Sequence, residues 1–69
     1  MKKRVYIVPN DVGLRNTLSA AGVVIYTVRL VNGEEVDVCD ETYARDDAIA
    51  RILDRYCEYA EIETVEREW

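Results

Sequence analysis

The chain has 69 residues, of which 49% are hydrophobic and 33% are charged, as in one small folded domain that spans residues 1–69. Fourteen acids, nine bases and no histidine give a net charge of -5. This balance argues against ordinary binding to nucleic acid or anionic lipid, because phosphate contact requires clustered lysine and arginine.

The charges are unevenly distributed along the chain. Residues 1–33 carry five bases and one acid, whereas residues 34–69 carry thirteen acids and four bases. The first segment therefore has a net charge of +4 and the second a net charge of −9.

The first half of the chain predicts a strand, a helix and a second strand. Lys3–Val8 is β-branched and aromatic and stops at Pro9, which indicates a strand. Asn10 or Asp11 can cap a helix over Val12–Ala21, and Gly22 supplies its stop. Val23–Val31 has the strongest strand character in the chain.

The second half predicts a hairpin, a helix and a last strand. Asn32-Gly33 is typical of a type I′ turn. In the return strand Glu34–Cys39, Val36 and Val38 face inward, and Glu35 and Asp37 face solvent. A helix then begins near Asp46-Asp47, and a last strand over Glu61–Arg67 follows it. The apolar stripe of this helix consists of Ile49, Ile52, Leu53, Tyr56, Cys57 and Ala60.

The element order β-α-β-β-α-β indicates an α+β, ferredoxin-like fold. We expect a four-stranded antiparallel sheet with two helices on one face. Right-handed crossovers place the first and third strands in the centre and the second and fourth at the edges.

Residues that carry catalytic chemistry are scarce. Without histidine, neither Ser19 nor the two cysteines can form a Ser/His or Cys/His pair. The spacing of Cys39 and Cys57 matches no zinc-binding motif, and we interpret both as free, partly buried thiols. We therefore expect a non-enzymatic protein without cofactor or metal. No apolar run is long enough for a membrane span or a signal peptide, so we expect it in the cytoplasm.

The segment after the first strand resembles the ACT family of small-ligand regulatory domains. The resemblance is carried by Asn10-Asp11-Val12-Gly13-Leu14, Leu18 and Ala21-Gly22-Val23-Val24-Ile25. It implies a ferredoxin-like fold and an amino-acid-binding loop formed by Asn10, Asp11, Gly13 and Leu14. The interval from Gly13 to Gly22 leaves room for a first helix that is about one turn, or roughly 3.6 residues, shorter than in that family.

The acids of the second half are the other functional signal. In size, fold, charge and lack of a catalytic set, the chain resembles small phage anti-CRISPR proteins of the DNA-mimic type. That resemblance implies an inhibitor that covers a basic nucleic-acid-binding surface, such as that of a CRISPR effector subunit. The partner-binding residues we predict are carboxylates: Glu34, Glu35, Asp37, Asp40, Glu41, Asp46, Asp47, Asp54 and Glu58.

Tyr43 and Tyr59 are candidate aromatic anchors for such a partner, although packing inside the domain is the more common role for each. Two interpretations that involve no basic partner surface remain open. The acids can simply keep a small domain soluble, or the chain can be an assembly protein that pairs through an exposed strand edge.

Overall fold

The computed structural model describes residues 2–64 and contains one four-stranded antiparallel sheet and two α-helices. The strand order β2-β3-β1-β4 and the α+β composition confirm the predicted ferredoxin-like arrangement, including which strands lie in the centre. The elements in chain order are β1 (Lys2–Ile7), α1 (Val12–Ala20), β2 (Tyr26–Arg29), β3 (Glu35–Asp40), the 3₁₀ helix η1 (Glu41–Arg45), α2 (Asp47–Tyr56) and β4 (Glu58–Glu63).

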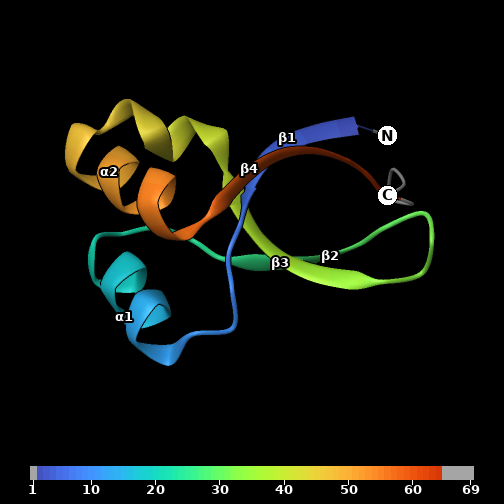
Figure 1. Cartoon of the computed structure of the whole chain (residues 1–69), viewed down its shortest axis with the longest axis horizontal. Helices are drawn as coiled ribbons and strands as arrows, with labels where there is room; N and C mark the ends of the chain where they lie inside the picture. Colours follow the sequence, from blue (N-terminus) through green and yellow to red (C-terminus); the bar gives the residue numbers. More distant parts are fainter. Residues whose placement is uncertain (1, 65–69) are drawn as a thin grey trace.

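The two α-helices cover one face of the sheet and bury the first of two apolar clusters (Figure 1). Leu18 of α1 and Leu53 of α2 are fully buried there, against Tyr6 of β1 and Cys39 of β3. Each helix is started by a side-chain cap, because Asp11 accepts from the Leu14 amide and Asp46 from the Ala48 and Ile49 amides.

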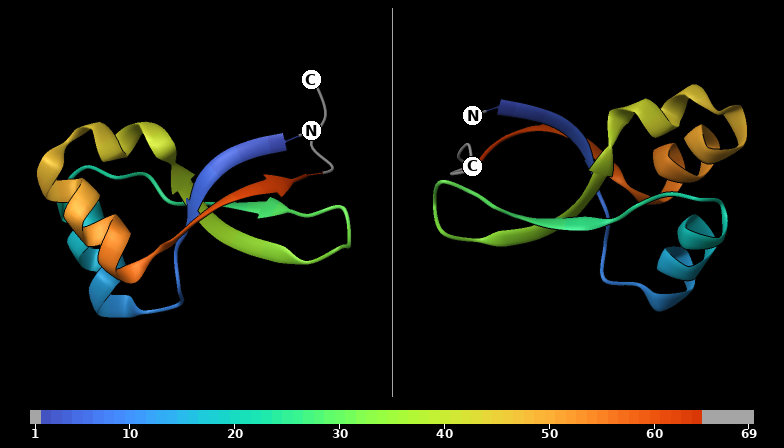
Figure 2. Two further views of the ribbon diagram at one scale, coloured as in Figure 1. Left: turned by 45° about the horizontal axis from the view of Figure 1, so that its top comes forward. Right: turned by 180° about the vertical axis from the view of Figure 1, so that it is seen from behind.

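The sheet is bent so that it forms two arms. β1 pairs with β4 along six residues and with β3 along only three, Val5–Ile7. Beyond this short junction, the β1–β4 ribbon and the β2–β3 hairpin both extend away from the helices on the same side (Figures 1 and 2).

The facing surfaces of the two arms enclose the second apolar cluster. Val5, Val38 and Ile62 are buried in it, and further apolar residues of both arms pack around them. Lys3 on one arm places its Nζ 5.7 Å from the ring centroid of Tyr26 on the other. The face that an open ferredoxin-like sheet leaves without helices is therefore covered by the sheet itself.

The tips of the arms are joined by backbone pairing. Leu30 and Thr64 form an antiparallel bridge, and the Val31 amide donates to the Glu63 carbonyl at 3.2 Å. Thr64 is 3% exposed. The two ends of a four-stranded sheet are thus brought into contact at one point.

Several predicted boundaries are wrong for reasons that lie in tertiary contacts. The second strand covers only Tyr26–Arg29, because Val23 turns inward and its amide donates to the Leu18 carbonyl at the end of α1. The second helix ends at Tyr56 rather than continuing to Ala60, because 58–63 pairs with β1 along its whole length. The last strand consequently begins three residues earlier than predicted, and residues 65–67 of that prediction lie outside the described residues.

The turn between β2 and β3 also differs from the prediction. Only Gly33, with φ of 93°, has a positive φ, so Asn32 does not adopt the conformation that a type I′ turn needs. The Gly33 amide donates to the Leu30 carbonyl and the Leu30 amide to the Glu34 carbonyl. This pattern matches a type I turn followed by a left-handed glycine.

The second cluster gives a direct test of the two-arm arrangement. Val38 is 0% exposed, so Val38→Ala leaves a cavity and lowers the free energy of unfolding by about 2 kcal/mol. The matched control is Val24→Ala, because Val24 is 62% exposed, and its effect stays within about 0.5 kcal/mol. Urea unfolding measures both, and equal effects of the two variants would contradict a buried second cluster.

Candidate functional site

The fold places eight of the nine predicted carboxylates in two groups at opposite ends of the molecule. Glu34 and Glu35 lie in the β2–β3 hairpin, whereas six others gather around η1, α2 and the start of β4 (Figure 1). Asp37 lies between these groups, on β3. We call the six the helix-end carboxylates: Asp40, Glu41, Asp46, Asp47, Asp54 and Glu58.

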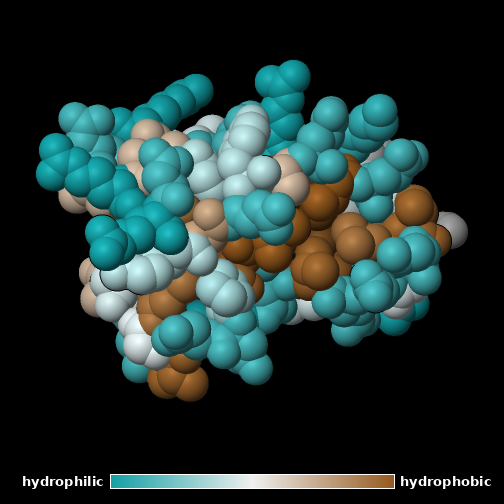
Figure 3. Space-filling model, in the orientation of Figure 1, coloured by the Kyte–Doolittle hydropathy of each residue, from teal (hydrophilic) through white to brown (hydrophobic). Residues whose placement is uncertain are grey.

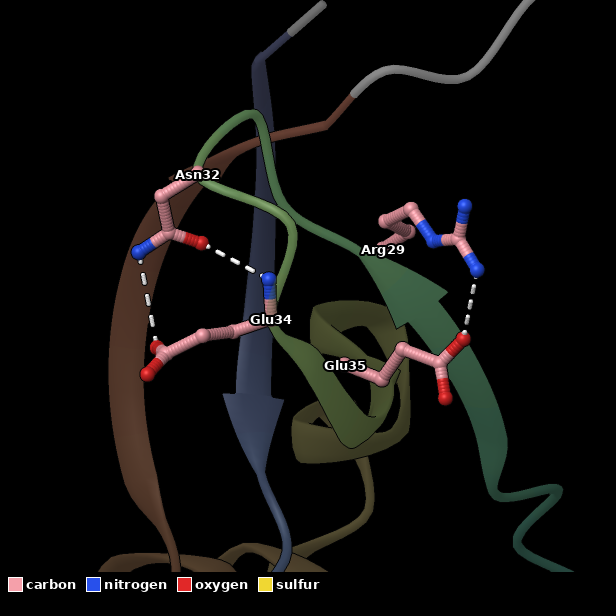
Figure 4. A network of polar contacts seen from close by, with 4 residues as sticks. All are labelled: Arg29, Asn32, Glu34 and Glu35. Atoms are coloured by element: carbon pink, nitrogen blue, oxygen red, sulfur yellow. Dashed lines mark hydrogen bonds and ion pairs between the residues drawn. The ribbon is translucent and has the colours of Figure 1, made fainter.

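The hairpin carboxylates are engaged within the hairpin itself (Figure 4). Glu35 accepts from Arg29 at 3.1 Å, and both side chains are more than half exposed. Asn32 accepts from the Glu34 amide at 2.9 Å and donates to the Glu34 carboxylate at 3.4 Å. These contacts hold the turn and compensate part of the local negative charge.

Asp37 is a structural residue in this fold rather than the outward-facing acid that the strand pattern predicts. Its carboxylate forms an ion pair with Arg15 of α1 and accepts from the Thr27 hydroxyl at 2.6 Å. About two thirds of each charged side chain is covered, since the exposed fractions are 32% for Arg15 and 31% for Asp37. The pair therefore ties α1 to the sheet.

The helix-end carboxylates differ because none of them forms an ion pair with a base among residues 2–64. Five of the six are exposed, and Glu41 is partly buried. Three arginines, Arg45, Arg51 and Arg55, lie in the same stretch of chain, so residues 40–58 carry a net charge of −3. The surface over η1 and α2 in Figure 3 is mostly hydrophilic.

Local hydrogen bonds hold three of these carboxylates in place. Asp40 accepts from the Thr42 amide at 2.9 Å at the start of η1, and Asp46 caps α2. The Tyr59 hydroxyl donates to the Glu41 carboxylate at 2.8 Å. Their charges are consequently displayed from defined positions, which lowers the entropy lost when a partner binds.

Two tyrosine rings lie beside this group. Tyr6 and Tyr59 pack with ring centroids 5.1 Å apart and an interplanar angle of 55°. Burial, followed by the nearby Asp54 carboxylate, raises the pKa of Tyr6. The hydrogen bond to Glu41 raises the pKa of Tyr59, so both phenols stay neutral at physiological pH.

The two candidate anchors have different surroundings. Tyr59 is 52% exposed next to Glu41, so its ring is available to a partner. Tyr43 packs against the first apolar cluster, and its hydroxyl accepts from the Val24 amide at 3.2 Å. Tyr56, which the helical stripe assigned to the core, is 56% exposed with the Arg55 guanidinium over its ring. Tyr56 is the last residue of α2 and Tyr59 lies in β4. Helical periodicity in the sequence does not show where α2 ends, so it does not predict that Tyr56 is exposed.

Chemically reactive groups are sparse in the described part of the chain. Cys39 and Cys57 are free thiols, as predicted. Burial raises the pKa of Cys39 to about 11, so this thiol stays protonated near neutral pH. Within residues 2–64, no three Cys, Asp or Glu side chains converge as metal ligands do, and no helix is long and apolar enough to cross a membrane.

A shallow groove between α1 and α2 contains part of the ligand loop that the ACT resemblance implies. Asp11, Leu14, Thr17, Ile52 and Tyr56 line it. Asn10 precedes α1, Gly13 and Leu14 lie within it, and the Asp11 carboxylate serves as the helix cap. Two of the four implied residues thus reach the groove, so ligand binding there stays a prediction.

Comparisons with protein-family models, with curated proteins and with solved structures find no match to this chain. Its function must therefore be inferred from the arrangement of its own residues.

The ion pairs Arg15–Asp37 and Arg29–Glu35 differ in burial, and this difference predicts different effects on stability. Asp37→Asn leaves the half-buried Arg15 without its counter-ion and lowers the free energy of unfolding by about 1–2 kcal/mol. Glu35→Gln is the matched control, because its exposed pair with Arg29 contributes at most about 0.5 kcal/mol. Chemical denaturation compares them, and a stability loss confined to Glu35→Gln would refute the structural role of Asp37.

Proposed function

We propose that this protein is a non-enzymatic inhibitor whose helix-end carboxylates bind a basic nucleic-acid-binding surface on a partner protein. The observation that carries the proposal is the set of six carboxylates without ion pairs among the described residues, three of which are fixed by hydrogen bonds. Charged oxygens held at defined positions can take the place of phosphate groups on a surface of lysines and arginines.

The partner class follows from the same chemistry. A basic groove that normally holds DNA attracts an acidic protein over distances of several ångströms and speeds its association, in a salt-dependent way. By its resemblance to acidic anti-CRISPR proteins, the chain has a CRISPR effector subunit as the proposed partner, and it acts by blocking target DNA. Tyr59 supplies an aromatic surface beside the carboxylates on which an arginine of the partner can stack.

The location of the binding surface distinguishes this proposal from one based on net charge. Glu35 and Asp37 have bases of their own, and Glu34 lies at the far end of the hairpin, so we assign these three no primary role. The ACT-like alternative uses a different surface, the groove between α1 and α2, and does not depend on the helix-end carboxylates.

A competition assay with a purified CRISPR effector and labelled target DNA tests the proposal with two matched double variants. Asp46→Asn with Asp47→Asn keeps the helix cap, since asparagine caps as well as aspartate, but removes two charges from α2. Glu34→Gln with Glu35→Gln removes two charges from the hairpin. Both change the net charge from -5 to −3.

We expect the α2 variant to inhibit about fivefold less well, from about 0.5 kcal/mol for each exposed ion pair lost, and the hairpin variant to match the wild type. The loss shrinks as salt is raised. Equal weakening by both variants would show that only net charge matters. Failure of the wild-type protein to displace DNA would overturn the CRISPR-effector assignment.

A further inference from the structure

The outer edge of β2 meets no other strand along Tyr26–Arg29 within residues 2–64, because β2 is a terminal strand of the sheet. The Leu30 amide points across the hairpin to the Glu34 carbonyl. Since backbone groups alternate in direction along a strand, those of Thr27 and Arg29 point outward, to the open edge. Such an edge presents donors and acceptors that another extended segment can bind.

The contact at the arm tips determines the register of any strand that continues past Thr64. Leu30 pairs antiparallel with Thr64, and the Val31 amide donates to the Glu63 carbonyl. The pairing of β4 with β1 ends at Lys2 and Glu63, so β1 offers no further partner beyond this point. Continued in the Leu30–Thr64 register, residues 65–69 would lie opposite residues 29–25, in reverse order. These five residues are enough to cover the four residues of β2.

A groove of about 500 Å³ lies at the far end of this path, between α1 and the segment that precedes β2. Its lining includes Val12 of α1, which is 71% exposed, and Val23 and Ile25. In the register set by the tips, Trp69 would lie opposite Ile25 and on the same face, because opposite residues of an antiparallel pair share a face. An indole ring buries a large apolar area, which this groove offers.

The charges of the same segment fit the face on which they would lie. Glu66 and Glu68 would be opposite Val28 and Tyr26, which face the second apolar cluster. Lys3 lies on that face, with its Nζ 5.7 Å from the ring centroid of Tyr26. A carboxylate next to Tyr26 would therefore lie near an amine, where opposite charges are favourable.

Tethering favours residues 65–69 over a strand from another molecule. The segment begins at the tip bridge, directly beside the edge that it would cover. Its effective concentration at this edge is on the order of millimolar, and a separate strand must compete with it. The sequence pattern agrees, since it predicts a strand that runs through Arg67.

We propose that residues 65–69 pair with the outer edge of β2 and place Trp69 in the groove beside α1. The last strand then passes from β1 to β2, and the bent sheet closes on itself. Residues 65–69 thereby cover an edge that is otherwise open to strands of other proteins. This inference does not depend on the helix-end carboxylates or on the proposed inhibitory function.

NMR of the isotope-labelled full-length protein tests the register. Residues at the positions of an antiparallel pair that lack hydrogen bonds have closely spaced α protons. We therefore expect nuclear Overhauser effects between the α protons of Val28 and Glu66 and between those of Tyr26 and Glu68. Their absence, in spectra where the tip bridge is present, would overturn the proposal. In a mixture of labelled and unlabelled protein, effects found only between different copies would also overturn it, because the segment would then come from a second copy.

Two variants with the same charge change test the groove. Val12→Glu places a carboxylate in it at the first residue of α1, where an acid is favourable to the helix, and Asn10→Asp adds the same charge outside it. Trp69 is the only tryptophan, so its fluorescence reports on its own surroundings.

We expect Val12→Glu to speed amide exchange at Thr27 and Arg29 by about tenfold, which corresponds to about 1.4 kcal/mol of lost docking free energy. Acrylamide should also quench the fluorescence of Trp69 more strongly in this variant than in the wild type. Asn10→Asp should match the wild type in both measurements. Identical exchange and quenching in Val12→Glu and the wild type would contradict the docking of Trp69, whatever the outcome of the DNA competition assay.

Discussion

The structure depends on one constraint: two short helices cover one face of the sheet, and its other face needs a different cover. α1 has nine residues and α2 has ten, and both lie on the same face. A chain of this size needs almost all of its apolar residues in a core, so the opposite face cannot stay in water. Bending the sheet into two arms resolves the conflict, because each arm becomes the cover of the other.

The strand order determines which acids lie next to bases. β1 carries three bases of the first half of the chain and lies between β3 and β4, which carry acids of the second half. Arg4 faces Glu61 and Lys2 faces Glu63 across the β1–β4 pairing, while Arg15 and Arg29 reach the acids of β3. The strong separation of charge along the sequence is therefore reduced within the sheet. It persists at the helix end, where the described carboxylates have no ion-pair partner.

The sequence predicts what depends on local chemistry. Hydrophobic alternation and helical spacing indicate both α-helices, all four strands and the ferredoxin-like order, and Asp11 and Gly22 mark the limits of α1. It does not predict boundaries that tertiary pairing decides. Tyr56, Cys57 and Ala60 continue the helical spacing of α2, yet pairing with β1 begins the last strand at Glu58. The partner of Asp37 is likewise hidden from the sequence, since Arg15 lies on α1, far away along the chain. Which acids keep their charge uncompensated is thus a property of the fold.

Contact between the tips of the two arms is the most direct test of this account, because the second cluster is enclosed only when the two arms close on each other. NMR spectra of the uniformly labelled protein should contain a nuclear Overhauser effect between the α protons of Leu30 and Thr64, and slow exchange of the Val31 amide, which donates to Glu63. Absence of both signals, in spectra where the β1–β4 and β2–β3 pairings are intact, would mean that the arms are open and would contradict the account.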